Sequence, residues 1–179
     1  MKPAVQGKLS QITYSILGAG NVGLALAADI EDRGDRALLY ATPGHDRVLN
    51  KIEAQGHLDA TEALTGRYHP TITHDLHHLI SSSDYLVIAL PSDAHEDLWA
   101  LLRPYKLRLR NKTVIFITGN GVSPLACREL ELSNACETSR APYTCRIEEH
   151  DHGIVKVCWL HGRLCCPTEL SSSTSVPDI

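Results

Sequence analysis

The chain has 179 residues, a length that fits one ordinary domain. Hydrophobic residues make up 43% of it, enough for a packed core, and a formal net charge of −4 gives no electrostatic basis for binding nucleic acid. No apolar run approaches the roughly 20 residues needed to cross a bilayer, and the first residues lack the apolar stretch of a signal peptide. These features predict a globular cytoplasmic protein that binds neither nucleic acid nor membrane.

Short apolar strands alternate with helices through most of the chain. The first strand is expected at Ile12–Leu17, and a helix of small and aliphatic residues follows at Leu24–Ile30. Further strands are expected at Ala37–Tyr40, Thr71–Thr73, Tyr85–Leu90 and Thr113–Thr118, and further helices at His45–Gln55, Asp75–Ile80, Ala94–Arg103 and Ser123–Leu132. Residues 56–70 are expected to be irregular, because Gly66 and Pro70 interrupt them. This alternation produces βαβ units, so we predict an α/β fold with a Rossmann-type, doubly wound parallel sheet.

The cysteines give no sign of a metal site. All six lie in the carboxy-terminal half, at positions 127, 136, 145, 158, 165 and 166. None forms the Cys-x-x-Cys pair typical of zinc sites, so free thiols are favoured over metal ligands or disulfides.

A glycine-rich turn directly follows the first expected strand. Its residues are Gly18, Ala19, Gly20, Asn21, Val22 and Gly23, which fit the pattern G-x-G-x-x-G. Gly18 permits the tight turn, Gly20 leaves room for a diphosphate, and Gly23 lets the helix lie close to the sheet. The diphosphate would face unpaired N–H groups at the positive end of the helix dipole. The turn therefore predicts binding of NAD or NADP; the alternative is a glycine-rich turn without a ligand.

The end of the second strand bears on the choice between these two cofactors. NAD-dependent enzymes usually place an Asp or Glu there to hold the ribose hydroxyls. Tyr40 and Ala41 are not acidic, and Thr42, His45 and Arg47 follow them as potential donors to a 2′-phosphate. The alternative is that His45 and Arg47 only begin the next helix and face water. We therefore favour NADP over NAD.

Two later strand ends are expected to complete the cofactor site, because ligands of such sheets bind at the carboxyl ends of the strands. Leu90, Pro91 and Ser92 should pass beneath the bridge between the adenosine and the nicotinamide. Gly119 and Asn120 should lie near the nicotinamide, where a glycine allows the backbone to approach closely. Either segment could instead be an ordinary turn.

Several segments of the chain resemble the octopine and nopaline (opine) dehydrogenases. They are Gly56–Leu58, Gly66–Pro70, Ile72–Leu76, Ala89–His95, Thr118–Asn120 and Glu137–Arg146. The last segment is the most specific, because a Glu-Thr, a Pro-Tyr and then an Arg at this spacing are unusual outside that family. The resemblance extends from about residue 13 to residue 146.

The resemblance implies a reductive condensation, an oxidoreductase reaction on a CH–NH group. An amino acid and a 2-oxo acid form an imine, and NAD(P)H delivers hydride to its carbon. The resemblance also places Glu137–Arg146 beside the nicotinamide as a candidate substrate site. Arg140 or Arg146 could clamp a carboxylate in bidentate geometry, and Glu137 could anchor the loop. For each, the alternative is an Arg–Glu pair that holds the edge of the domain.

Members of that family also carry a second, mostly helical domain, in which the resemblance places the catalytic histidine. We assign residues 1–146 to an NAD(P)-binding Rossmann domain. We assign residues 147–179 to a short carboxy-terminal extension, a remnant of the linker to a second domain that is missing from this chain, since they are too few to fold as one. His150, His152 and His161 follow no family motif, so no catalytic residue is assigned.

Three functions remain open. The first is an opine-dehydrogenase-like oxidoreductase, truncated and weakly active, which acts on a small-molecule substrate. The second is a non-catalytic NAD(P)-binding module, and the third is an enzyme of the ketopantoate-reductase or imine-reductase type. Glu137–Arg146 favours the first over the third, and the missing domain favours the second over the first. Because a solitary Rossmann domain leaves its interdomain face uncovered, we expect self-association or a partner at Trp159, Leu160 and their neighbours.

Overall fold

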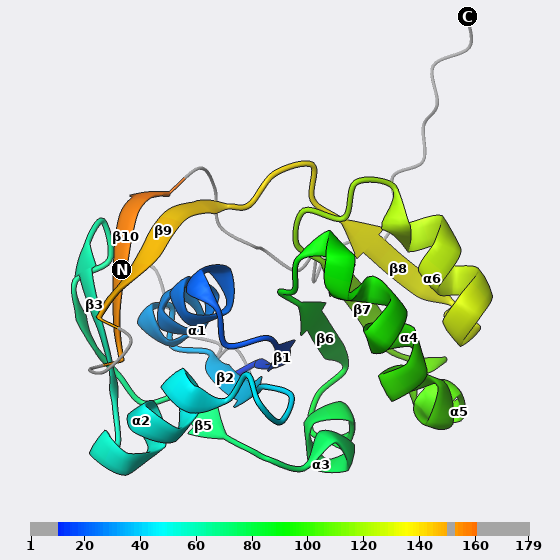
Figure 1. Ribbon diagram of the computed structural model, residues 1–179, viewed down its shortest axis with the longest axis horizontal. Helices are drawn as coiled ribbons and strands as arrows, with labels where there is room; N and C mark the ends of the chain where they lie inside the picture. Colours follow the sequence, from blue (N-terminus) through cyan, green and yellow to red (C-terminus); the bar gives the residue numbers. More distant parts are fainter. Residues whose placement is uncertain (1–10, 150–152, 161–179) are drawn as a thin grey trace, which may run out of the picture.

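The computed structural model describes residues 11–149 and 153–160, and for Glu149, Trp159 and Leu160 it describes the backbone alone. Its central feature is a parallel sheet with the strand order β5-β2-β1-β6-β7-β8 (Figure 1). These strands are β1 (Thr13–Leu17), β2 (Arg36–Tyr40), β5 (Thr71–Ile72), β6 (Tyr85–Ile88), β7 (Thr113–Phe116) and β8 (Asn134–Glu137). Counted within this sheet alone, the order is 3-2-1-4-5-6, which is the order of the Rossmann fold. The fold class predicted from the sequence is confirmed.

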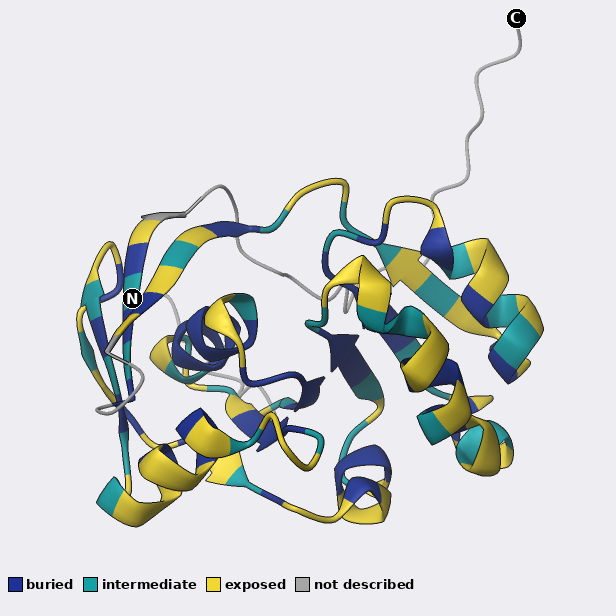
Figure 2. Cartoon of the chain, in the orientation of Figure 1, coloured by how far each residue is buried: buried dark blue, intermediate teal, exposed yellow. Residues whose placement is uncertain are grey.

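Helices cover both faces of the parallel sheet. They are α1 (Asn21–Asp32), α2 (Arg47–Gln55), α3 (Leu76–Ser81), α4 (His95–Leu102), α5 (Lys106–Leu109) and α6 (Val122–Leu130), with single 3₁₀ turns at Ser92–Ala94 and Arg103–Tyr105. Successive side chains of a strand point to opposite faces, so Ile16 packs with α1 and α2 while Leu17 packs with α3, α4 and α6. Figure 2 shows the resulting buried interior in β6 and on α1. Among the helices of the described residues, none is both long and apolar enough to cross a membrane.

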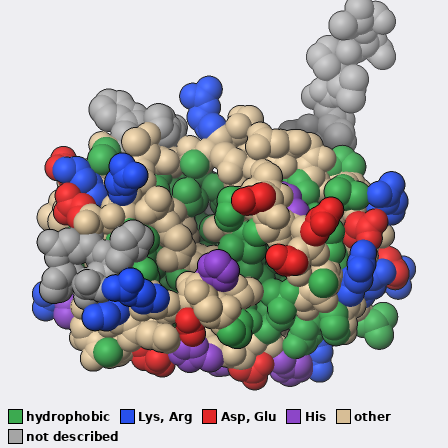
Figure 3. Space-filling view, in the orientation of Figure 1, with side chains coloured by type: hydrophobic (Ala, Val, Ile, Leu, Met, Phe, Trp, Pro, Cys, Tyr) green, Lys and Arg blue, Asp and Glu red, His purple; other side chains and the backbone are tan. Residues whose placement is uncertain are grey.

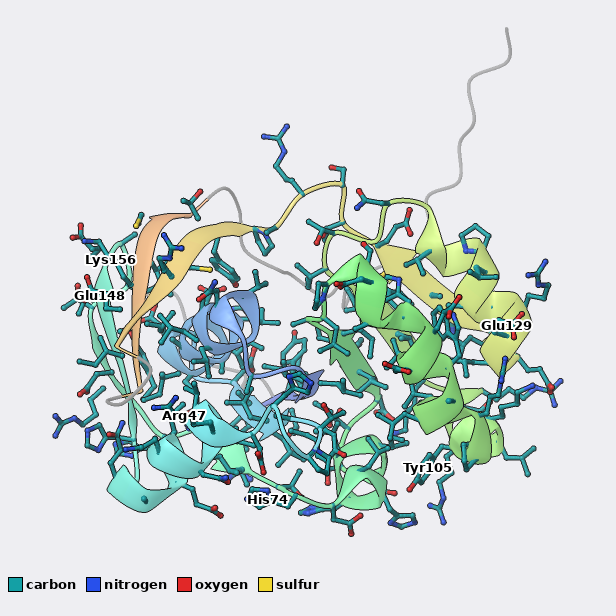
Figure 4. The ribbon with its side chains drawn as sticks, in the orientation of Figure 1. Arg47, His74, Tyr105, Glu129, Glu148 and Lys156 are labelled. Atoms are coloured by element: carbon teal, nitrogen blue, oxygen red, sulfur yellow. The ribbon has the colours of Figure 1, made fainter. Side chains whose placement is uncertain are left out.

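A second, smaller sheet lies on the other side of α1, with the strand order β4-β3-β10-β9 (Figure 1). Its strands are β3 (Leu58–Glu62), β4 (Gly66–Tyr68), β9 (Tyr143–Glu149) and β10 (Ile154–Leu160). Its inner side chains pack against α1, whereas Lys156 forms ion pairs with Glu62 at 3.1 Å and Glu148 at 3.5 Å (Figure 4). The small sheet therefore has one apolar face and one charged face.

Helix α1 is enclosed between the two sheets, which explains its composition. Every residue from Gly23 to Ile30 is buried, as expected for a helix that is apolar on all sides. The one acidic residue of this stretch, Asp29, is 0% exposed and accepts a hydrogen bond from the Tyr143 hydroxyl at 2.8 Å. Burial and the neighbouring Asp29 raise the pKa of Tyr143, so the hydroxyl stays protonated as a donor. This bond joins β9 to the centre of α1.

The small sheet changes two expectations from the sequence. Residues 56–70 were expected to be irregular, but they contain β3 and β4, because β3 is completed by a parallel partner, β10, from the far end of the chain. The domain boundary expected at residue 146 lies inside β9, and β10 belongs to the same small sheet. The described part of the 147–179 segment is thus packed on the Rossmann unit. His150, His152 and His161 lie outside the described residues, as do the side chains of Trp159 and Leu160.

Candidate functional site

Two glycines of the turn after β1 are required by the packing of the turn itself. A Cβ at Gly23 would lie 1.9 Å from the carbonyl oxygen of Gly18, so α1 can approach the turn only with a glycine at this position. Gly18 has a φ of +121°, and a Cβ there would lie 2.5 Å from the carbonyl oxygen of Ala89, which follows β6. The turn, α1 and the end of β6 are therefore in direct contact.

The middle glycine, Gly20, has no such packing requirement. It is the N-cap of α1, with φ −83° and ψ −171°, an extended conformation that any residue can adopt. A Cβ at this position would meet nothing within 4 Å. The missing side chain therefore leaves open the space in front of α1, as the sequence predicted for a diphosphate site.

The amino-terminal end of α1 is suited to an anion. No side chain caps its first turn, and no acidic residue lies within that turn. The first N–H groups of a helix lack acceptors within the helix, and the helix dipole adds partial positive charge to them. The Asn21 side chain accepts a hydrogen bond from the Ile147 N–H at 2.8 Å, which holds β9 beside the turn. The site residues predicted at positions 21–23 can thus contribute through their backbone.

A cleft of about 710 Å³ opens at the carboxyl ends of β1, β2 and β6. It is lined by Gly18, Ala19, Gly20, Ala41, Thr42, Pro43, His45, Arg47, Val48, Ala89, Leu90, Pro91, Ala94, Asp97, Leu98, Leu101 and Ile147. Most of these residues are apolar and a few are polar, as is typical of ligand pockets. In Figure 3, hydrophobic side chains gather in the middle of this face, with acidic side chains beside them on the α4 side.

The loop between β2 and α2 forms the cationic wall of the cleft. Thr42, His45 and Arg47, which were predicted from the sequence as a group, all line it, and Arg47 begins α2 (Figure 4). The preceding residues, Tyr40 and Ala41, are buried and not acidic. The cleft wall next to a ribose at this position therefore carries positive rather than negative charge.

The remaining predicted cofactor residues lie at the ends of β6 and β7. Leu90 and Pro91 line the cleft, whereas Ser92 is exposed in the 3₁₀ turn that follows. Gly119 and Asn120 follow β7, which pairs with β6, but they are not part of the cleft lining. The structure thus places Gly119 and Asn120 one strand beyond Leu90 and Pro91, along the same edge of the sheet.

The predicted substrate residues do not gather in the cleft. Glu137 ends β8, and its carboxylate accepts hydrogen bonds from the N–H groups of Gly121 at 2.8 Å and Ser123 at 2.9 Å, which lower its pKa. Arg140 is exposed in the loop between β8 and β9. Arg146 is exposed on β9, next to Lys156 and on the opposite side of the strand from Ile147.

Some lining residues were not predicted from the sequence. Asp97, Leu98 and Leu101 come from one face of α4, whose amphipathic pattern showed that it packs on the sheet but not which side chains reach the cleft. Ile147 reaches the cleft only because β9 crosses the amino-terminal end of α1, an arrangement with no local sequence signal.

A comparison with known protein sequences identifies several relatives of the chain. No family model matches the chain. It is 28% identical over 139 residues to D-nopaline dehydrogenase from Agrobacterium vitis. The aligned region covers 77% of this chain and 34% of that protein. It is 27% identical over 156 residues to vitopine synthase from Allorhizobium ampelinum, and that aligned region covers 81% of this chain and 42% of that protein. The resemblance to nopaline-type dehydrogenases is confirmed, and the chain spans about a third of the length of the first of these relatives.

Solved structures with a similar architecture include dehydrogenases and reductases. D-mandelate dehydrogenase with NADH and anilino(oxo)acetate matches with a TM-score of 0.61 at 16% identity, over 82% of this chain and 45% of that chain. A PanE/ApbA family ketopantoate reductase from Ralstonia eutropha JMP134 matches with a TM-score of 0.58 at 17% identity, over 85% of this chain and 47% of that chain. At such identities the likeness shows the shared Rossmann-type fold.

Proposed function

We propose that this chain is the dinucleotide-binding domain of an NAD(P)-dependent oxidoreductase of the opine-dehydrogenase type. The observation that carries the proposal is Gly20. A glycine that the fold does not need stands at the N-cap of α1, where it leaves the first N–H groups of the helix accessible from the cleft. The similarity to D-nopaline dehydrogenase supports the same assignment.

The residues present fit a nicotinamide dinucleotide. The diphosphate would accept hydrogen bonds from the N–H groups at the start of α1. The adenosine would lie between the β2–α2 loop and α4, where Pro43, Leu98 and Leu101 supply apolar surface. When bound, the reduced cofactor supplies a hydride. The residues of the chain would orient the cofactor, and the apolar walls of the cleft would exclude water.

We propose NADP as the preferred cofactor. Arg47 and His45 line the side of the cleft where the adenosine ribose would lie, and the acidic residue lining the cleft, Asp97, belongs to α4 instead. A 2′-phosphate would therefore meet a guanidinium rather than a carboxylate. Charge-assisted hydrogen bonds from arginine to phosphate are among the stronger interactions in proteins.

Fluorescence titration with NADPH and NADH tests both proposals. We expect both cofactors to bind, NADPH more tightly than NADH. We expect Arg47→Gln to weaken the binding of NADPH by about tenfold or more, since a hydrogen bond to a charged group contributes roughly 1.5–3 kcal/mol. The affinity for NADH should change little. Arg146→Gln is the matched control, because Arg146 is exposed outside the cleft lining.

Each failure of this titration has a separate meaning. A chain that binds neither cofactor would overturn the dinucleotide-binding proposal. Equal affinities for NADPH and NADH, or an equal loss of both in Arg47→Gln, would overturn the preference for NADP and leave the dinucleotide site standing.

A second candidate, a module that binds the dinucleotide without catalysis, is favoured by the composition of the cleft. Reduction of an imine delivers hydride to its carbon and needs a proton donor for its nitrogen. Among the described residues that line the cleft, the ionisable side chains are His45, Arg47 and Asp97, and all three lie around the adenosine half. The residues at the end of β6, Leu90 and Pro91, carry no ionisable group.

A further inference from the structure

The loop that follows β7 adopts a backbone conformation that few side chains tolerate. Thr118 has a φ of 57° and Asn120 a φ of 51°. Asparagine enters this left-handed region fairly often, but for a β-branched residue such as threonine it is unusual. Such strain persists only where the surrounding structure imposes it, and it concentrates at functional sites.

Thr138, just after β8, holds the first part of this loop. Its hydroxyl oxygen accepts a hydrogen bond from the Thr118 N–H at 3.0 Å, and its carbonyl oxygen accepts one from the Gly119 N–H at 3.2 Å. Its own N–H donates to the Phe116 carbonyl at 2.9 Å and continues the pairing of β8 with β7. The strained residue is therefore tied directly to the edge of the sheet.

Glu137 holds the second part. One carboxylate oxygen accepts from the Gly121 N–H at 2.8 Å and the other from the Ser123 N–H at 2.9 Å. A Cβ at Gly119 would lie 2.4 Å from the Cβ of Glu137, so the loop rests directly on this side chain. Both carboxylate oxygens accept backbone N–H groups, so Glu137 holds this part of the loop.

The position of the loop indicates what it serves. β7 pairs with β6 on the side away from β1 and β2, so the loop continues the row formed by the glycine turn and Leu90. A dinucleotide with its diphosphate at α1 and its adenosine beside β2 must extend its other nucleoside toward the ends of β6 and β7. The loop therefore lies at the nicotinamide end of the proposed cofactor.

We infer that Glu137 and Thr138 are positioning residues for the nicotinamide nucleoside, which they serve by holding the loop of residues 118–121, with Thr118, Asn120 and Gly121 left-handed, in place. The inference rests on the proposed dinucleotide-binding function. It separates the site into two parts, one for adenosine built by the β2–α2 loop and α4, and one for nicotinamide set by the end of β8. The hydrogen bonds from the loop also lower the pKa of the Glu137 carboxyl.

The test compares NADPH with 2′-phospho-ADP-ribose, which has the diphosphate and the adenosine half but lacks nicotinamide. Thr138→Val keeps the shape of the side chain and removes its acceptor, whereas Thr138→Ser keeps the acceptor. Glu137→Gln keeps one acceptor oxygen and replaces the other with an amide NH₂ group. We expect Thr138→Val and Glu137→Gln to weaken the binding of NADPH by about three- to tenfold, which corresponds to the loss of one net hydrogen bond. We expect unchanged binding of 2′-phospho-ADP-ribose, and Thr138→Ser should bind both probes like the unaltered chain.

Three results would overturn the inference. If Thr138→Val and Glu137→Gln weaken both probes equally, the two residues serve only to stabilise the fold. If they weaken neither probe, the loop does not meet the nicotinamide. An unaltered chain that binds 2′-phospho-ADP-ribose and NADPH with equal affinity would also contradict it, whereas an unaltered chain that binds neither probe would instead overturn the proposed dinucleotide-binding function.

Discussion

Gly20 and Gly23 are three residues apart in one glycine pattern, yet they are glycine for different physical reasons. Gly23 is enclosed, with the carbonyl oxygen of Gly18 where its Cβ would be, while Gly20 faces open space. The sequence pattern alone cannot separate the two cases, because both positions carry the same letter. The structure shows that packing does not account for the glycine at position 20, and we propose that the diphosphate does.

This difference predicts opposite outcomes for two small substitutions. Gly20→Ser should leave the free energy of unfolding unchanged or raise it by up to about 1 kcal/mol, since serine is a favoured N-cap residue. The same substitution should weaken the binding of NADPH by more than about tenfold. The serine side chain would occupy the anion site, and its hydroxyl oxygen would accept hydrogen bonds from the N–H groups that the diphosphate needs. Gly23→Ala should instead lower the free energy of unfolding by roughly 1–3 kcal/mol through overpacking. Urea denaturation and NADPH titration of both variants check this; a Gly20→Ser chain that binds normally would count against the site.

At the scale of elements, the strand–helix–strand units could be predicted and the small sheet could not. β1, α1 and β2 carry local signals: an apolar run, a glycine turn and a helix of small residues. β3 has only Leu58 and Ala60 facing inward, and it becomes a strand by pairing Asp59 with Ile154. Residues 56–70 looked irregular because the partner of β3 lies far away in the chain and leaves no signal within this segment.

The same distinction holds for the site. Residues that directly follow parallel strands, such as Thr42 and Leu90, could be predicted because the carboxyl ends of those strands meet at one edge. Ile147 could not, because its place in the cleft depends on how β9 crosses α1. Glu137 was proposed from the sequence as a residue that could anchor its loop, but its two backbone partners became visible only in three dimensions.

The joint between α1 and β9 gives a prediction at this scale. Tyr143→Phe removes the hydroxyl that donates to the fully buried Asp29, and it should lower the free energy of unfolding by about 1–3 kcal/mol. Tyr68→Phe is the matched control, since the Tyr68 hydroxyl donates at 3.2 Å to Asp32, which is exposed on the same helix. Its cost should stay below about 1 kcal/mol because water replaces the lost bond. Equal costs in urea denaturation would show that the burial of Asp29 has no energetic importance.

At the scale of the whole molecule, one wall of the cleft is cationic and the opposite wall, on α4, is acidic. His45 and Arg47 stand on the first wall and Asp97 on the second, with apolar side chains between them (Figure 3). Such a site can hold an anionic dinucleotide firmly. Among the described residues that line the cleft, those at the end of β6 carry no ionisable side chain.

We therefore expect the 179-residue chain to bind NADPH without oxidising it. Absorbance at the reduced nicotinamide band, followed with pairs of amino acids and 2-oxo acids, should show no decrease above the buffer rate. Fluorescence titration of the same preparation provides the control that the chain is folded and carries the cofactor. Steady consumption of NADPH would refute the binding-only candidate and support catalysis by this chain.

The enclosure of α1 between two sheets has a consequence for biosynthesis. The helix is translated before strands β9 and β10, which cover its outer side and are the last strands among the described residues. Until then the leucines and alanines of α1 lack part of their cover, and a nascent chain in that state can adhere to other unfolded polypeptides. The glycine turn is thus synthesised well before the strands that complete its surroundings.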